Sequence, residues 1–327
     1  MLKPLEVLIS VDTSFSLGEG SKKHLKYSPI GERSILCDGN GLGFMLDALD
    51  RFHINASFFI ETANESYFGA EPMGKIVKKI LLSGQDTQLM VNPSWCYFDK
   101  SAKYSINDSC AGREYIELRT ILEKSLKTFK KWCNKKPLVI RAANGQVDQL
   151  FYKVIYDLGI HMSSSIGLEM NIPHGKEMLL YSGRSRIADI MEVPLFTYQD
   201  KDIMGGYPSK TWQIATSSWK EMIYILKKAR KMEVESIVLL TKPSDYIKKK
   251  SPDYSEITQN RINQERLLKL CSFINEYDQD FVSVDFSTTA EGWNKSESNN
   301  IKRFKVPTRF RNGRKIENLI NKMFWNF

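Results

Sequence analysis

Polar and charged side chains follow most of the short apolar segments of this sequence, and such positions carry the chemistry of many α/β proteins. A carboxylate there can accept a proton, an arginine can orient that carboxylate, and a lysine can stabilise negative charge. Proton transfer, or recognition of a polar ligand, is therefore the chemistry these residues indicate. The positions are Asp12, Thr13, Glu61, Asn92, Pro93, Arg141, Glu192 and the range 242–245.

Three of these residues are candidates for catalysis. Asp12 is predicted to act as a base or to accept hydrogen bonds from ligand hydroxyls; the alternative is that it only caps the end of its strand. Arg141 is predicted to orient Asp12, and a purely structural role predicts the same contact. Lys242 is predicted to lie within salt-bridge reach of Asp12 or Asp245, because an unpaired buried carboxylate is costly. Its alternative is a solvated loop lysine.

Four further side chains are candidates for substrate binding. Asn92, Glu192 and Asp245 stand at or near strand ends, and Trp95 is either an aromatic platform or a core residue at the barrel rim. No spacing typical of a Ser-His-Asp or Cys-His site is recognisable. Two histidines are predicted to be structural and two to lie in polar loops that border a cleft or are solvated: His53 and His161, then His24 and His174.

Apolar periodicity predicts the elements that must hold these side chains. A buried strand over 5–11, a helix over 41–52 and a strand over 54–61 begin a β-α-β rhythm. About seven such units predict an α/β fold with a closed or nearly closed barrel. The remaining helices are expected over 71–84, within 112–133, over 147–159, 217–231 and 255–277, and the remaining strands over 87–91, 137–142, 160–166, 192–198, 236–241 and 280–286.

Several segments resemble, in order, the motifs of the polysaccharide deacetylase (NodB homology) family. "VDTS" (11–14) resembles a motif with an aspartate pair, "NASFFIE" (55–61) resembles "ATFFVE", and "GQDTQLMVNPSW" (84–95) resembles "GHDVQLHLHPxW". The later motifs are resembled by 141–166, by "MEVP" (191–194) and by "LLTKPSDY" (239–246). The resemblance spans residues 5–286 and is to the divergent branch linked to surface-polysaccharide biosynthesis. It implies a distorted (β/α)7-type barrel that removes acyl groups from sugars.

The resemblance also implies which functional residues have changed. The family holds a divalent ion by Asp-His-His, with a second aspartate as base and a later histidine as acid. Asp12 stands at the base position, and Lys242 stands at the acid position. Thr13, Met90 and Asn92 stand at the metal positions, and their neutral oxygen and thioether groups are poor ligands for Zn²⁺. We therefore expect the zinc site to be lost, and no cofactor in its place.

Two functions remain open. In the first, the protein is polysaccharide deacetylase-like and acts on an N-acylated sugar in capsule or O-antigen biosynthesis, through a site without zinc ligands. If active, it is an amide hydrolase. In the second, it is an inactive relative that binds a glycan or a glycan-assembly enzyme.

Positive charge is concentrated at the C-terminus. From Ile301 onward there are eight basic residues and one acid, so +7 of the formal charge of +9 lies there. The nearly neutral remainder argues against nucleic-acid binding. We expect a barrel over 1–290 and a polar linker with a basic, aromatic tail over 291–327. The end of the tail, 316–327, is predicted either to lie on an anionic membrane surface or to dock on the barrel.

The remaining composition indicates a cytoplasmic protein, peripheral to the membrane if the tail binds it. No apolar run of about 18 residues and no signal-peptide pattern is present. Five scattered cysteines, none in a C-x-x-C pair, are predicted to be reduced thiols. The pattern does not determine an oligomeric state.

Overall fold

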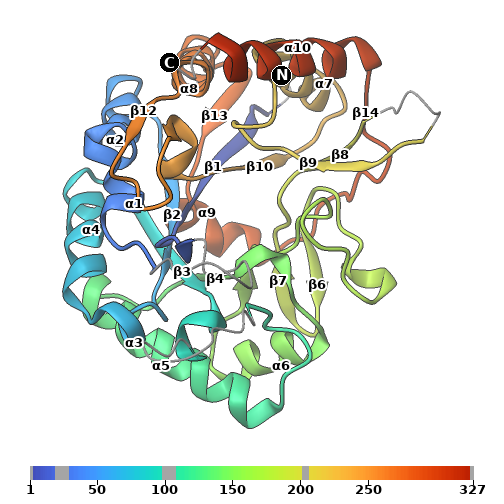
Figure 1. Ribbon diagram of the computed structural model, residues 1–327. Helices are drawn as coiled ribbons and strands as arrows, with labels where there is room; N and C mark the ends of the chain where they lie inside the picture. The colour runs from blue at the N-terminus through green and yellow to red at the C-terminus, as the bar shows by residue number, and fades with distance from the viewer. Residues whose placement is uncertain (1–2, 19–28, 98–107, 201–205, 325–327) are drawn as a thin grey trace.

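The computed structural model describes residues 3–18, 29–97, 108–200 and 206–324, and shows a parallel sheet curved into a barrel and surrounded by helices (Figure 1). The strand order is β10-β1-β2-β3-β4-β5-β7-β6, with β13 paired to β1. Only β6 and β7 pair antiparallel in this sheet. The α/β fold class is thereby confirmed. The strands are β1 (Leu5–Thr13), β2 (Ala56–Glu61), β3 (Asp86–Val91), β4 (Val139–Ala142), β5 (Met162–Ser163), β6 (Ser185–Ile187), β7 (Ile190–Glu192), β10 (Ser236–Thr241) and β13 (Phe281–Ser283).

The barrel closes through irregular backbone between β7 and β10. The N–H of Leu195 donates to the Ile166 carbonyl, and the N–H of Phe196 donates to the Val238 carbonyl. We predicted one strand over 192–198, but the structure divides this segment into the end of β7, an extended connection and β8 (Thr197–Asp200). The division arises because β8 leaves the barrel to pair with β9 (Ser209–Thr211) and β14 (Lys305–Val306).

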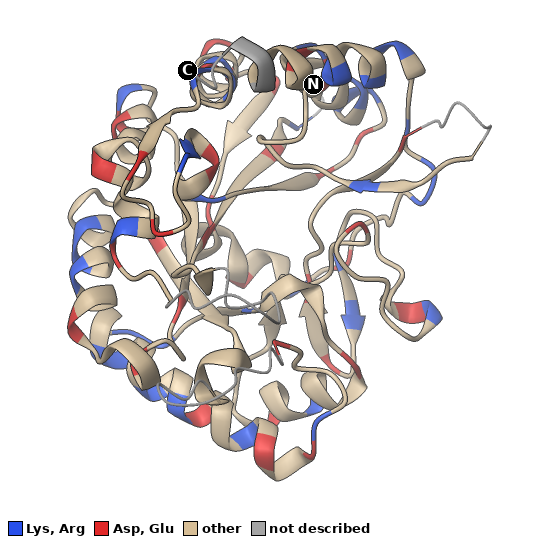
Figure 2. Cartoon of the chain, viewed as in Figure 1, with Lys and Arg blue, Asp and Glu red and all other residues tan. Residues whose placement is uncertain are grey.

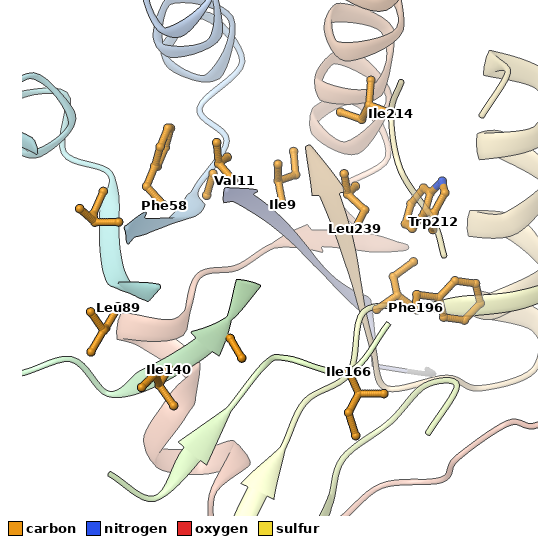
Figure 3. Close-up of a cluster of buried hydrophobic side chains, with 14 of the residues drawn as sticks. Ile9, Val11, Phe58, Leu89, Ile140, Ile166, Phe196, Trp212, Ile214 and Leu239 are labelled. Atoms are coloured by element: carbon orange, nitrogen blue, oxygen red, sulfur yellow. The ribbon is translucent and has the colours of Figure 1, made fainter. Parts of the chain in front are cut away.

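Alternating side chains along the strands build two apolar layers. One face of each strand packs against the helices, as Ile9 and Val11 of β1 do with Phe58 of β2 and Leu239 of β10 (Figure 3). The other face fills the barrel interior, where Leu8 of β1 belongs to the inner cluster. Because both faces of these strands are covered, their sequences are nearly continuous apolar runs.

Helices cover the outside of the sheet and begin close to the predicted positions. Ser218 and Glu221 form the expected capping box at the start of α7. α8 begins at Arg261 rather than 255, because Ile257–Gln259 forms β12 and pairs with β11 (Ile247–Lys249). The helices are α1 (Arg33–Leu36), α2 (Leu42–Arg51), α3 (Glu65–Phe68), α4 (Glu71–Leu82), α5 (Tyr115–Cys133), α6 (Gln149–Asp157), α7 (Trp219–Lys231), α8 (Arg261–Glu276), α9 (Phe286–Trp293) and α10 (Thr308–Phe324).

The C-terminal segment packs on the barrel as far as the structure describes it. α9 crosses the boundary that we expected at 290, and its Phe286 and Trp293 belong to the inner apolar cluster. Beyond it, Ser298 pairs with Arg184 through backbone hydrogen bonds, and Phe304 is fully buried. Within the predicted end segment, 316–327, Glu317 forms an ion pair with Arg266 of α8, so docking on the barrel, one of the two alternatives, is observed for the part that the structure describes. All five cysteines are free thiols, as predicted.

Candidate functional site

Side-chain alternation places several of the strand-end residues on the inner face of the barrel. Leu8 points inward, so Ser10 and Asp12, two and four positions later on β1, face the same way. Because parallel strands end at one edge, these inward residues lie together at the C-terminal end of the barrel. The same spacing of two relates the inward-facing Phe59 to Glu61, Met90 to Asn92, Val139 to Arg141 and Leu240 to Lys242.

Arg141 is the centre of the candidate site. Its Nη1 lies 2.8 Å from Asp12 Oδ1 and 3.1 Å from the Ser10 hydroxyl. Its Nε and Nη2 donate to the carbonyl and the hydroxyl of Ser164, at 2.6 and 2.9 Å. The guanidinium is stacked 3.7 Å from the centre of the Phe59 ring. Burial lowers the pKa of Arg141, and the Asp12 charge opposes this effect.

The expected Asp12–Arg141 contact is thus confirmed, and it leaves part of Asp12 accessible. The Arg141 side chain is 2% exposed, whereas that of Asp12 is 19% exposed. Asp12 borders a cleft of about 140 Å³ at the barrel end. The cleft is lined by Asp12, Ser14, Phe15, Ser16, Ser34, Ile35, Lys242, Pro243, Ser244 and Tyr254.

Lys242 lines this cleft but does not form the predicted salt bridge. The side chain is exposed, and among the described residues no carboxylate lies within 4.0 Å of its ammonium. Asp245 instead accepts from the Thr241 hydroxyl and the Lys242 backbone N–H, at 3.2 and 3.1 Å. Burial raises the pKa of Asp245, the Lys242 charge lowers it, and the Asp12 charge adds a smaller increase. The compensating ion pair is therefore a wrong prediction, although the three charges are neighbours.

Asn92 occupies a neighbouring strand end without lining the Asp12 cleft. Its side-chain oxygen accepts from the Ser94 N–H at 3.1 Å. Its own N–H approaches Glu61, whose carboxylate accepts from the N–H groups of Ala63 and Asn64 at 2.7 and 3.1 Å. Burial raises the pKa of Glu61 to about 7, and these donors oppose the increase. Glu61 therefore organises the loops after β2 and β3.

The positions that would hold the family's zinc do not fit that ion. The Thr13 hydroxyl is fully buried and donates to the Val11 carbonyl at 3.3 Å. The Met90 side chain belongs to the apolar inner cluster, and the Asn92 side-chain oxygen already accepts a hydrogen bond from the Ser94 N–H. A zinc site needs imidazole, thiolate or carboxylate ligands, which this set lacks. Within the described ranges, no other group of three His, Cys, Asp or Glu residues is arranged to hold a metal.

Two predicted substrate ligands are structural instead. Trp95 is 1% exposed and packs against Tyr67 and Phe68, so it is the core residue of the two alternatives. Glu192 is fully buried and accepts from the N–H groups of Ser165 and Ile166, both at 2.8 Å. Its neighbours Met191 and Val193 face the barrel interior, so alternation turns Glu192 outward toward α6.

The histidines contribute nothing to the described site. His53, His161 and His174 are exposed, and none lines the Asp12 cleft. His24 lies outside the described residues. Sequence reasoning missed Ser10 and Ser164, which hold Arg141. The position of Ser10, two residues before Asp12 on the same strand, was the available signal.

Solved structures show that this barrel is the polysaccharide deacetylase fold. The crystal structure of a Mycobacterium smegmatis protein that is described as a polysaccharide deacetylase aligns with a TM-score of 0.53 and 12% identity, over 90% of this chain and 92% of that chain. A Pseudomonas aeruginosa protein with the same description aligns with a TM-score of 0.50 and 9% identity, over 90% of this chain and 91% of that chain. A CE4 family pseudoenzyme from Bacillus anthracis aligns with a TM-score of 0.45 and 10% identity, over 94% of this chain and 71% of that chain.

Sequence comparisons add no family assignment. No family model matches the chain, and no curated protein matches it. Identities of about one residue in eight or fewer show the fold alone. The fold is compatible with many functions, and the side chains of the site determine which of them this protein has.

Proposed function

We propose that this protein recognises an N-acylated sugar of a capsule or O-antigen building block at the Asp12 cleft, through a site without the family's metal ligands. The observation that carries the proposal is the Asp12–Arg141 pair, held at 2.8 Å where the strands of a deacetylase-fold barrel end. The setting in surface-polysaccharide assembly is supported only by the resemblance of the motifs.

The cleft has the chemistry of a small hydroxyl-binding site. Asp12 Oδ1 is engaged by Arg141, whereas Asp12 Oδ2 has no hydrogen-bond partner among the described residues. That oxygen can accept from a sugar hydroxyl or amide N–H, and Lys242 can donate from the same cleft. Arg141 holds the carboxylate in place because Ser10 and Ser164 hold Arg141.

Binding without hydrolysis is the version that the geometry favours. Amide hydrolysis needs a group that stabilises the oxyanion and an acid that protonates the leaving amine. Among the described residues lining the cleft, Lys242 is the sole cation, and it is exposed rather than held against Asp12. Asp12 is itself committed to an ion pair with Arg141. The site therefore holds a ligand more readily than it turns one over.

Residual hydrolysis is the second candidate, and one observation favours it. Asp12 and Lys242 border the same cleft, so a bound acyl group would meet a carboxylate and an ammonium together. In this version Asp12 takes a proton from water and Lys242 supplies one to the leaving amine.

The deciding experiment measures ligand binding and acyl release on the same preparation. Nucleotide-linked and lipid-linked N-acetyl and N-formyl amino sugars are titrated by calorimetry, while acetate and formate are quantified. We expect binding that Asp12→Asn weakens at least tenfold, because the anionic acceptor is lost. Asp47→Asn, an exposed aspartate on α2, is the matched control.

The outcomes separate the versions. Binding without acyl release supports the binding protein, and release that Asp12→Asn abolishes supports the hydrolase. If no amino sugar binds, or if Asp12→Asn and Asp47→Asn behave alike, the Asp12 cleft is not the recognition site.

A further inference from the structure

The outer face of α10 exposes an apolar stripe although the helix is docked on the barrel. Ile316 is 58% exposed, Leu319 is 57% exposed and Ile320 is 41% exposed. Their spacing of three and four residues places them on one side of the helix. We call these three residues the α10 stripe. Burying them would remove three large side chains from water, which is a strong driving force for association.

The inner face of α10 is accounted for by contacts with the barrel. Arg314 is buried and binds the carboxylates of Asp200 and Glu221. Glu317 receives an ion pair from Arg266 at 2.7 Å, and Phe310 stacks against Tyr224 of α7 with ring centres 4.8 Å apart. The helix is therefore held in a fixed orientation, and the α10 stripe is the side turned away from the barrel.

Basic side chains lie on α10 and on the segments next to it. Figure 2 shows Lys and Arg repeatedly along α10 and the adjoining α7. At the C-terminal end of α10, Lys248 donates to the Asn321 carbonyl. Lys249 and Lys250, which follow Lys248 in the sequence, are exposed. The one acid of the segment from 301 onward, Glu317, is already paired with Arg266. The exposed basic residues on α10, on the segment that leads into it and next to Lys248 are Lys302, Arg303, Lys305, Arg309, Lys315, Lys249 and Lys250. We call these residues the basic border.

We propose that the α10 stripe and its basic border form a docking surface for an anionic lipid membrane, with α10 lying parallel to the bilayer. The stripe would enter the region between headgroups and acyl chains, and the basic side chains would bind the anionic headgroups. Among the described residues, no helix is long and apolar enough to cross a membrane.

A membrane fits this surface better than a second copy of the chain. A two-fold contact through α10 would place the same basic border against itself, and like charges at an interface are costly. Anionic lipids instead supply the opposite charge over a wide area. The inference is independent of the proposed sugar site, because α10 contributes no residue to the Asp12 cleft.

The test is co-sedimentation of the full chain with vesicles of phosphatidylcholine, with and without one third phosphatidylglycerol. We expect binding only to the anionic vesicles, and release as salt rises. The apolar variant Ile316→Gln/Leu319→Gln should reduce vesicle binding by roughly tenfold or more. Its matched control is Leu82→Gln/Ile116→Gln, which removes two side chains exposed by 78% and 77% on α4 and α5.

A charge variant tests the basic border separately. It combines Lys302→Gln, Arg303→Gln, Arg309→Gln and Lys315→Gln, and we expect it to lose vesicle binding. Its control neutralises four exposed lysines on α4 and α5, at Lys78, Lys79, Lys127 and Lys130. Thermal unfolding of every variant checks that folding is retained.

Two outcomes would overturn the proposal. One is that anionic vesicles bind no protein, or bind the α10 variants and their controls equally. The other is self-association in sedimentation equilibrium that the apolar variant abolishes while vesicles bind nothing, which would make the α10 stripe an interface between copies.

Discussion

At the residue scale, the candidate site depends on Arg141, a buried cation whose N–H groups donate hydrogen bonds to other groups of the protein. Arg141 binds Asp12, Ser10 and Ser164, and each hydrogen bond offsets part of the cost of burying a guanidinium. Asp12 supplies the only opposite charge in direct contact with Arg141 among the described residues. The pair therefore contributes to stability, and the proposed ligand binding at Asp12 would depend on the same contact.

Replacing Asp12 by alanine should destabilise the fold. The change leaves Arg141 buried without its counter-charge, so we expect the free energy of unfolding in urea to fall by about 3 kcal/mol. Asp12→Asn keeps an acceptor for Nη1 and should cost less. Asp47→Ala, at an exposed position, should stay within about 0.5 kcal/mol of the native protein. Equal effects of the two alanine variants would show that the Asp12–Arg141 pair adds no stability.

Replacing Lys242, in contrast to Asp12, should have little effect on stability. The side chain is exposed and forms no ion pair with a described carboxylate, so Lys242→Met should change the free energy of unfolding by about 0.5 kcal/mol or less. Ligand binding should weaken, because the variant loses a donor that lines the cleft. A loss of several kcal/mol in urea unfolding would reveal a buried pair that this conformation lacks.

Glu61 should make stability depend on pH. Its pKa is raised from 4.5 to about 7 in the folded protein, so between these values the folded state keeps a proton that the unfolded state releases. The free energy of unfolding should therefore fall as pH rises from 4.5 to about 7, by up to about 3 kcal/mol, and then level off. Subtracting the Glu61→Gln profile isolates this contribution. Parallel profiles for the two proteins would contradict it.

At the element scale, α10 is joined to the barrel by a buried charge cluster. Arg314 inserts between Asp200, at the end of β8, and Glu221, in the first turn of α7. The same β8 pairs with β14, so the segment after α9 is held by backbone as well as side chains. A basic C-terminal segment therefore became a structural part of the fold.

Arg314→Met should loosen α10 and destabilise the protein. Two buried carboxylates would lose their shared cation, which costs about 3–5 kcal/mol. Faster amide hydrogen exchange in α10 and a lower urea midpoint are the expected observations. The neighbouring Lys315→Met is the control, since Lys315 is exposed on the same helix. If both variants exchange alike, the charge cluster does not hold the helix.

At the whole-molecule scale, the barrel should accept a metal site when the three residues predicted to replace the metal ligands are changed to Asp and His. The fold is that of polysaccharide deacetylases, and β1, β2 and β3 lie side by side in parallel. The triple variant Thr13→Asp, Met90→His and Asn92→His should therefore bind Zn²⁺ or Co²⁺ stoichiometrically in calorimetry and in the visible spectrum of cobalt. A folded triple variant that binds neither ion would show that these three positions no longer converge.

The sequence by itself determined the order of strands and helices along the chain and which residues stand at strand ends, and it predicted that the metal ligands are replaced. These follow from local properties: apolar period, alternation along a strand, and the identity of each donor atom. Only the tertiary structure determined which strand-end side chains border a cleft and which are covered. Trp95 and Glu192 are covered by neighbouring segments, whereas Asp12 borders a cleft. Arg141 reaches Ser10 across 131 residues because parallel strands bring distant segments to one edge, and no local pattern records that proximity.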